Sequence, residues 1–182
     1  MRGSASGQKA IDAFKAIKSD DWAGKNLSNT DISRLAATAT QEGLSGDDAL
    51  LTIVNVSADE YTWNEASEYS QLVTLATGAM EGLRTGKEAA TAFVNVSANK
   101  AVYDSLDAEG RFQLAAAALS TKQGTGTDAA NAYAAIHADS SLQDTNTPTH
   151  DALLAAAMVK GFDADSSSQL LDWYNASTRI TI

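Results

Sequence analysis

Residues 85–97 read Thr85-Gly-Lys-Glu-Ala-Ala-Thr-Ala-Phe-Val-Asn-Val-Ser97, and similar stretches recur along the chain. The clearest copies begin at Ser45 and Thr125, and weaker copies begin at Ser6 and Asp165. The five starting points are separated by 39, 40, 40 and 40 residues. An internal period of this length is typical of proteins built from stacked helical units.

Each clear copy begins as an α-helix should. Ser45, Thr85 and Thr125 are each followed three residues later by an acidic residue, which is the spacing of a capping box. Apolar residues then recur at i, i+1, i+4 and i+7, the pattern of a helix with one buried face. A second set of helices is predicted between the copies, over residues 31–42, 69–82, 109–122 and 149–160. A glycine follows each of these, where a left-handed residue is expected to end the helix: Gly43, Gly82, Gly124 and Gly161.

Short turns join the second set to the copies, and longer connections of about 10 to 12 residues lead back, so the helices should form antiparallel hairpins. We therefore expect an all-α fold of about nine helices with a ~40-residue internal repeat, arranged as a short, right-handed, α-solenoid-like array. A compact helical bundle is the alternative. Residues 1–5 are interpreted as a disordered expression-vector remnant, and residues 6–182 as a single α-helical repeat domain.

Composition narrows the possible partners. The 182-residue chain has a formal net charge of -10 and no cluster of Lys or Arg, so neither nucleic acid nor an anionic membrane surface is expected to bind. Cysteine is absent, which excludes disulfides and thiolate chemistry but leaves the cellular compartment open. No stretch approaches the length of apolar sequence that a membrane helix needs.

Aromatic residues mark the candidate binding positions. The longer connections carry Trp22, Tyr61, Trp63 and Tyr103, and long connections in compact proteins tend to be functional or to be fixed by an anchoring side chain. Trp173 and Tyr174 in the last copy would form an apolar end if they were exposed. The row Ile53, Phe93, Tyr133 and Trp173 is expected to lie mainly in the core.

A divalent-metal site is the alternative hypothesis. Two histidines and two carboxylates lie close in sequence, His137, Asp139, Asp144 and His150, and side chains of these types ligate metals. A histidine at a helix C-terminus beside helix-capping carboxylates explains the same residues without a metal. In the other copies Ser57 and Ser97 stand where His137 does, so the array does not require a histidine there.

No pattern of catalytic residues is recognisable in the sequence. There is no Gly-x-Ser-x-Gly motif, no phosphate-binding loop, and neither histidine has a distinctive sequence partner. We therefore expect a protein without catalytic activity or a cofactor. The favoured function is a protein–protein interaction or structural module that binds a protein partner or associates with itself. The alternative is a small-molecule or divalent-metal-binding helical protein that uses the loops around residues 137–151.

Overall fold

The computed structural model describes residues 3–121, 124–139 and 147–159. All regular secondary structure within these ranges is helical, which confirms the all-α class. The helices are α1 (Gly3–Ser19), α2 (Ala23–Asn26), α3 (Asn29–Gln41), α4 (Gly46–Ser57), α5 (Glu60–Glu65), α6 (Tyr69–Glu81), α7 (Gly86–Ala98), α8 (Lys100–Ser105), α9 (Ala108–Leu119), α10 (Gly126–His137) and α11 (Pro148–Val159).

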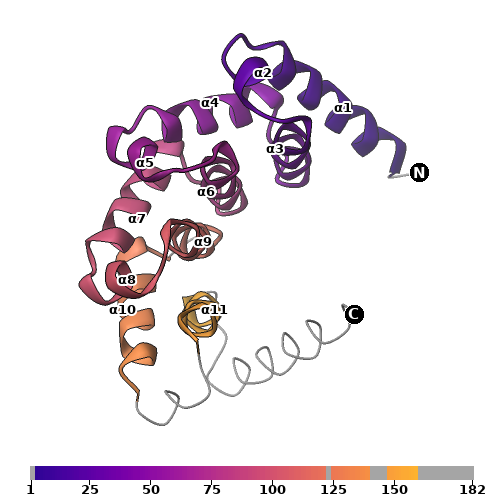
Figure 1. Ribbon diagram of the computed structural model, residues 1–182. Helices are drawn as coiled ribbons and strands as arrows, with labels where there is room; N and C mark the ends of the chain where they lie inside the picture. Colours follow the sequence, from indigo (N-terminus) through magenta and orange to yellow (C-terminus); the bar gives the residue numbers. More distant parts are fainter. Residues whose placement is uncertain (1–2, 122–123, 140–146, 160–182) are drawn as a thin grey trace, which may run out of the picture.

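The long helices pack in two rows that follow chain order. One row contains α1, α4, α7 and α10, and the other contains α3, α6, α9 and α11; each helix contacts the next helix of its own row. Figure 1 shows an open arc with the second row on its inner side and α1 and α11 at opposite ends. This packing is consistent with the predicted repeat array. Its handedness stays a prediction, and the last predicted copy, from Asp165, lies outside the described residues.

Short helices in the connections account for the difference in helix number. The sequence analysis treated the long connections as loops, whereas three of them contain the short helices α2, α5 and α8. Asp59 and Asn99 cap α5 and α8 by accepting hydrogen bonds from backbone amides of the first turn. Such brief helices lack the apolar periodicity by which longer ones are recognised. The N-terminal boundary also differs, because α1 begins at Gly3, inside the interpreted vector remnant.

The predicted capping boxes are confirmed in α4, α7 and α10. In α7 the Thr85 hydroxyl accepts from the Glu88 amide at 3.2 Å, and the Thr85 amide donates to the Glu88 carboxylate at 2.8 Å. Hydrogen bonds from the backbone and side chain of Thr85 lower the pKa of Glu88, and those from Ser45 lower the pKa of Asp48 in the same way. The caps therefore favour the ionised carboxylates.

Glycine at the first helical position allows α4, α7 and α10 to pack closely against the preceding helix of their row. A Cβ atom on Gly86 or Gly126 would lie 2.2 Å from a backbone carbonyl oxygen of the preceding helix in the row. On Gly46 it would lie 2.8 Å from the backbone of Ala13. Gly7, at the corresponding place in the first copy, would meet nothing within 4 Å. The glycine is therefore needed only where a preceding helix is present.

The expected left-handed glycine occurs at Gly43, which has φ +76°. After α6 the expectation is wrong, because Leu83 rather than Gly82 has the positive φ, at 55°. Gly82 is required for a different reason: a Cβ there would lie 1.8 Å from the carbonyl oxygen of Leu119. The close contact with the next hairpin, rather than backbone conformation, therefore accounts for this glycine.

The core runs continuously along the described array, from Ala13 in α1 to Ala155 in α11. Ile53, Phe93 and Tyr133 are fully buried in it, as predicted for the row that they form, while Trp173 lies outside the described residues. Phe93 also stacks on Phe112, with ring centroids 3.9 Å apart, which joins the two rows. Alanine occupies much of the remaining core, so neighbouring helices approach closely.

One buried position near the start of each inner-row helix is polar in all four helices. It is filled by Asp31, Gln71, Arg111 and Asp151, which are 40 residues apart and between 4% and 8% exposed. Buried polar groups need hydrogen-bond partners. Two of these side chains, Asp31 and Gln71, bond to the turn that enters their own helix, and the other two bond to side chains of other helices. These residues therefore connect each inner helix to the chain that precedes it.

Candidate functional site

Three aromatic rings gather where α2, α5 and the start of α6 meet. Tyr69 packs edge-on against Trp22, with centroids 6.2 Å apart, and against Trp63, with centroids 5.6 Å apart. The Tyr69 hydroxyl donates to the side-chain oxygen of Asn26 at 2.9 Å, and the Asn26 amide group donates to the Trp22 carbonyl at 2.8 Å. The cluster is therefore held in one arrangement by hydrogen bonds as well as by ring contacts.

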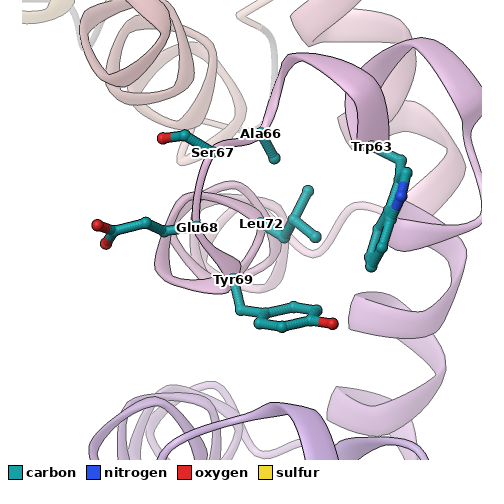
Figure 2. A pocket seen from close by; sticks show the side chains of 6 residues that line it. All are labelled: Trp63, Ala66, Ser67, Glu68, Tyr69 and Leu72. Carbon is teal, nitrogen blue, oxygen red and sulfur yellow. The ribbon is translucent and has the colours of Figure 1, made fainter.

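A pocket of about 230 Å³ opens beside this cluster, and we call it the Trp63 cleft. Figure 2 shows Trp63 and Glu68 at opposite sides of it, with Leu72 between them and Tyr69 along one edge. The side chain of Trp63 remains 39% exposed, and Glu68 is also exposed. The lining residues are Trp63, Ala66, Ser67, Glu68, Tyr69 and Leu72.

The start of α6 contributes polar groups to the Trp63 cleft. Glu68 is the N-cap residue, but its side chain does not cap the helix. The Ser67 amide donates instead to the side-chain oxygen of Gln71 at 2.8 Å, which fixes the turn that enters α6. The exposed Glu68 carboxylate accepts from the Ser70 hydroxyl at 3.2 Å. Apolar rings beside a few polar groups are features of a recognition site.

The other predicted aromatic binding residues lie elsewhere. Tyr61, also 39% exposed, is on α5 and packs against Phe93 at a centroid distance of 6.1 Å. Tyr103, which is 49% exposed, is on α8, where the guanidinium group of Arg111 lies over its ring. Trp173 and Tyr174 lie outside the described residues. Of the predicted set, the structure therefore brings together only Trp22 and Trp63, through Tyr69.

Arg111 joins two successive hairpins. Its guanidinium carbon lies 4.3 Å from the centre of the Tyr103 ring, and its Nη2 donates to the carboxylate of Glu65 at 2.7 Å. The Arg111 side chain is only 7% exposed and that of Glu65 is 24% exposed. The stacking on a ring and the pairing with a carboxylate offset much of the desolvation free energy that burial of a guanidinium costs.

His137 lies between Ser105 and Asp151. Its Nε2 is 3.2 Å from the Ser105 hydroxyl, and its Nδ1 is 2.8 Å from the Asp151 carboxylate. Tyr133 stacks on the imidazole at 5.5 Å, and burial raises the pKa of the Tyr133 hydroxyl, with the Asp151 charge acting in the same direction and Ser105 in the opposite one. The sequence analysis found no distinctive partner for either histidine, so this arrangement was missed.

The order Ser–His–Asp is also that of a hydrolytic triad, but the internal comparison favours a structural role. Ser105 and Asp151 are 46 residues apart, the same separation as Glu65 and Arg111. In each pair the first residue ends a short helix, and the second lies near the start of the second inner-row helix after it. Serine is too short to reach Asp151, and His137 spans the gap. The Ser105 hydroxyl is not positioned by a strained turn, whereas the nucleophile elbow of α/β-hydrolases is.

The described residues bring no metal cluster together. No group of three or more His, Asp or Glu side chains is arranged as metal ligands in the ranges that the structure covers. His137 is engaged by Ser105 and Asp151 on its two ring nitrogens, and Asp139 is exposed after the end of α10. Asp144 lies outside the described residues. The metal site therefore stays a prediction.

A second pocket, of about 430 Å³, lies between α1 and the turn from α3 to α4. Its lining includes Lys9, Asp12 and Asp47, with Leu44 as the large apolar residue and no aromatic ring of the kind that dominates binding energies. The Trp63 cleft is the better candidate for recognition.

Comparisons of the chain with protein-family models, with curated proteins and with solved structures found no match. Among the helices of the described ranges, none is both long and apolar enough to cross a lipid bilayer. The fold and the Trp63 cleft therefore define the protein as an all-α protein with an aromatic surface cleft, and its function is inferred from its own residues.

Proposed function

We propose that the protein is a non-catalytic interaction module that binds a partner protein in the Trp63 cleft. The observation that carries the proposal is the gathering of Trp22, Trp63 and Tyr69 beside a partly open pocket. Tryptophan and tyrosine are enriched among the residues that dominate protein–protein binding energies, especially where they line a well-packed pocket.

The internal repeat supports a role beyond packing for Tyr69. The corresponding residues in the other inner-row helices are Asn29, Glu109 and Thr149, none of which is aromatic. The helical array is built without an aromatic ring at those three places. Tyr69 is therefore an addition specific to one hairpin, and the pocket at that hairpin is the feature that it creates.

Preorganisation of the cleft supports the same proposal. Because Asn26 holds the Tyr69 hydroxyl and is itself bonded to the Trp22 backbone, the aromatic edge lies in a single arrangement before a partner arrives. Side chains that are already ordered lose less conformational entropy on binding. The negative charge of the chain and the exposed Glu68 favour a partner segment with basic residues near its apolar anchor.

Selection of random peptides displayed on phage tests this proposal. We expect enriched peptides to bind the intact protein and to lose binding to a Trp63→Ala variant. Tyr61→Ala is the matched control, because Tyr61 is on the same short helix with the same 39% exposure but outside the cleft. Circular dichroism checks that both variants remain folded. Peptides that bind Trp63→Ala as well as the intact protein, or a selection without enrichment, would argue against the proposal.

A further inference from the structure

The aromatic ring of Tyr103, on the short connecting helix α8, binds a guanidinium group. On α8 the Tyr103 ring carries the Arg111 guanidinium at 4.3 Å, and Glu65 holds that guanidinium from the preceding hairpin at 2.7 Å. The Tyr103 ring and the Glu65 carboxylate thus form a complete cation-binding site. The cation that occupies this site is the guanidinium group of Arg111 in the same chain.

The preceding hairpin has the same arrangement without its cation. Trp63 is 40 residues before Tyr103, and Gln71 is 40 residues before Arg111. Gln71 is neutral and buried, and its side-chain oxygen is occupied by the Ser67 amide. Among the described residues, the cation that lies over an aromatic ring is the guanidinium of Arg111, over Tyr103. The indole of Trp63, which is 39% exposed and packs against Tyr69, therefore carries no cation in the described residues, whereas its counterpart Tyr103, 49% exposed, carries Arg111.

We propose that the Trp63 cleft receives an arginine side chain from the partner protein, which takes the place that Arg111 fills in the next hairpin. This inference rests on the proposed function and names the chemistry of the group that the cleft recognises. Tryptophan is the aromatic side chain that attracts cations most strongly, and arginine stacks on aromatic faces more often than lysine does.

The charges around the cleft favour a cation. Glu68 lies on the far side of Leu72 from Trp63, and its carboxylate points away from the indole (Figure 2), so it adds negative charge at the rim of the cleft. The Glu68 carboxylate also offsets the partial positive charge at the start of α6. The formal charge of -10 on the whole chain attracts a basic partner at longer range.

Two small probes that differ in charge but hardly in shape provide the test. N-acetyl-arginine amide and its neutral citrulline analogue are titrated separately into isotopically labelled protein, and the indole N–H signals of the tryptophans are followed by nuclear magnetic resonance. We expect the arginine probe to shift the Trp63 signal and the citrulline probe to bind roughly 2- to 30-fold more weakly. Trp63→Ala should abolish the shift of the remaining signals near the cleft, Glu68→Gln should weaken it, and Tyr61→Ala should leave it unchanged.

The structure also suggests a variant in which the protein blocks its own site. Lys25 stands 46 residues before Gln71, in the same register as Glu65 before Arg111. The double substitution Lys25→Glu and Gln71→Arg should therefore place a guanidinium over Trp63 and prevent binding of the arginine probe. Gln71→Met, which adds no charge, is the control for the loss of the Gln71 hydrogen bond and should leave binding of the probe within about twofold of the intact protein.

The outcomes separate this inference from the proposed function. Equal affinity for the two probes would overturn the arginine inference while leaving a cleft that binds ligands. The same holds if neither probe binds although selected peptides bind in a Trp63-dependent manner. If selected peptides are insensitive to Trp63→Ala, the proposed function fails, and the arginine inference fails with it. A stronger shift with the arginine probe that is weakened in Glu68→Gln and lost in the double variant would support both.

Discussion

Replacement of Gly126 by alanine tests the packing on which the array depends. A Cβ atom there would lie 2.2 Å from the carbonyl oxygen of Ala92 and 2.8 Å from its Cα, so α10 would meet the backbone of α7. Backbone atoms cannot rotate away as the end of a side chain can. Gly7→Ala is the matched control, because Gly7 has the corresponding place in the first copy and would meet nothing within 4 Å.

The size of the effect follows from the geometry. Favourable contacts between carbon and a carbonyl oxygen lie at about 3.3 Å, so α10 must move by roughly 1 Å. A displacement of this size weakens dispersion along the whole contact, and overpacking typically costs about 1–3 kcal/mol. Alanine recovers at most about 1 kcal/mol through its helix propensity. We expect a net loss of about 1–2 kcal/mol for Gly126→Ala, and for Gly7→Ala a gain of up to about 1 kcal/mol.

Thermal unfolding followed by circular dichroism at 222 nm measures both effects. For a chain of this length, Gly126→Ala should lower Tm by about 2–8 °C, and Gly7→Ala should raise it by up to about 4 °C. Urea denaturation gives the change in unfolding free energy independently. Unchanged stability in Gly126→Ala, or equal destabilisation in both variants, would refute the inferred contact between α7 and α10.

Three further outcomes are expected. Thr85→Ala should destabilise the protein by about 1 kcal/mol near neutral pH, because it removes the hydroxyl half of the α7 capping box. Glu88 has a lowered pKa in the folded state, so its contribution to stability is present above its unfolded pKa and is lost as pH falls through the folded pKa. Glu88→Gln should therefore flatten the acid limb of a profile of stability against pH, measured below about pH 5. An unaltered acid limb would contradict this. Ser105 should not react with a fluorophosphonate probe, and labelling that disappears in Ser105→Ala would overturn the non-catalytic interpretation. Divalent ions should leave Tm unchanged, whereas a rise that is lost in both His137→Ala and His150→Ala would favour the metal hypothesis.

The fold could be predicted to a large extent because the same local signals occur several times. Capping residues and apolar spacing placed the start of α4, α7 and α10 at the residue where each begins, from Gly46 to Gly126. The short helices were not predicted, because their stability depends on caps such as Asp59 and on burial of one or two side chains. Six residues are too few for a periodic pattern.

The candidate site could be predicted only in part. The presence of aromatic residues in the long connections identified Trp22 and Trp63, whereas Tyr69 was expected only to begin a helix. Its partners Trp22 and Asn26 come from the preceding hairpin, and such contacts require the three-dimensional arrangement. One signal was nevertheless available in the sequence: Tyr69 is the aromatic member of a register position that is otherwise polar.

The 40-residue spacing also explains why the bonds made by Arg111 and by Gln71 have different consequences for the aromatic ring near each of them. Glu65 and Arg111 pair directly, and the Arg111 guanidinium lies over the Tyr103 ring. One hairpin earlier Gln71 turns back to the Ser67 amide, so the ring at the corresponding place, Trp63, has no internal cation. Packing requirements are shared by all copies, whereas at this buried position the ion pair of Arg111 between hairpins is replaced by the bond of Gln71 to its own entering turn. A polar position can therefore exchange its partners in one hairpin while the apolar contacts between neighbouring helices are kept, which allows a binding site to arise there.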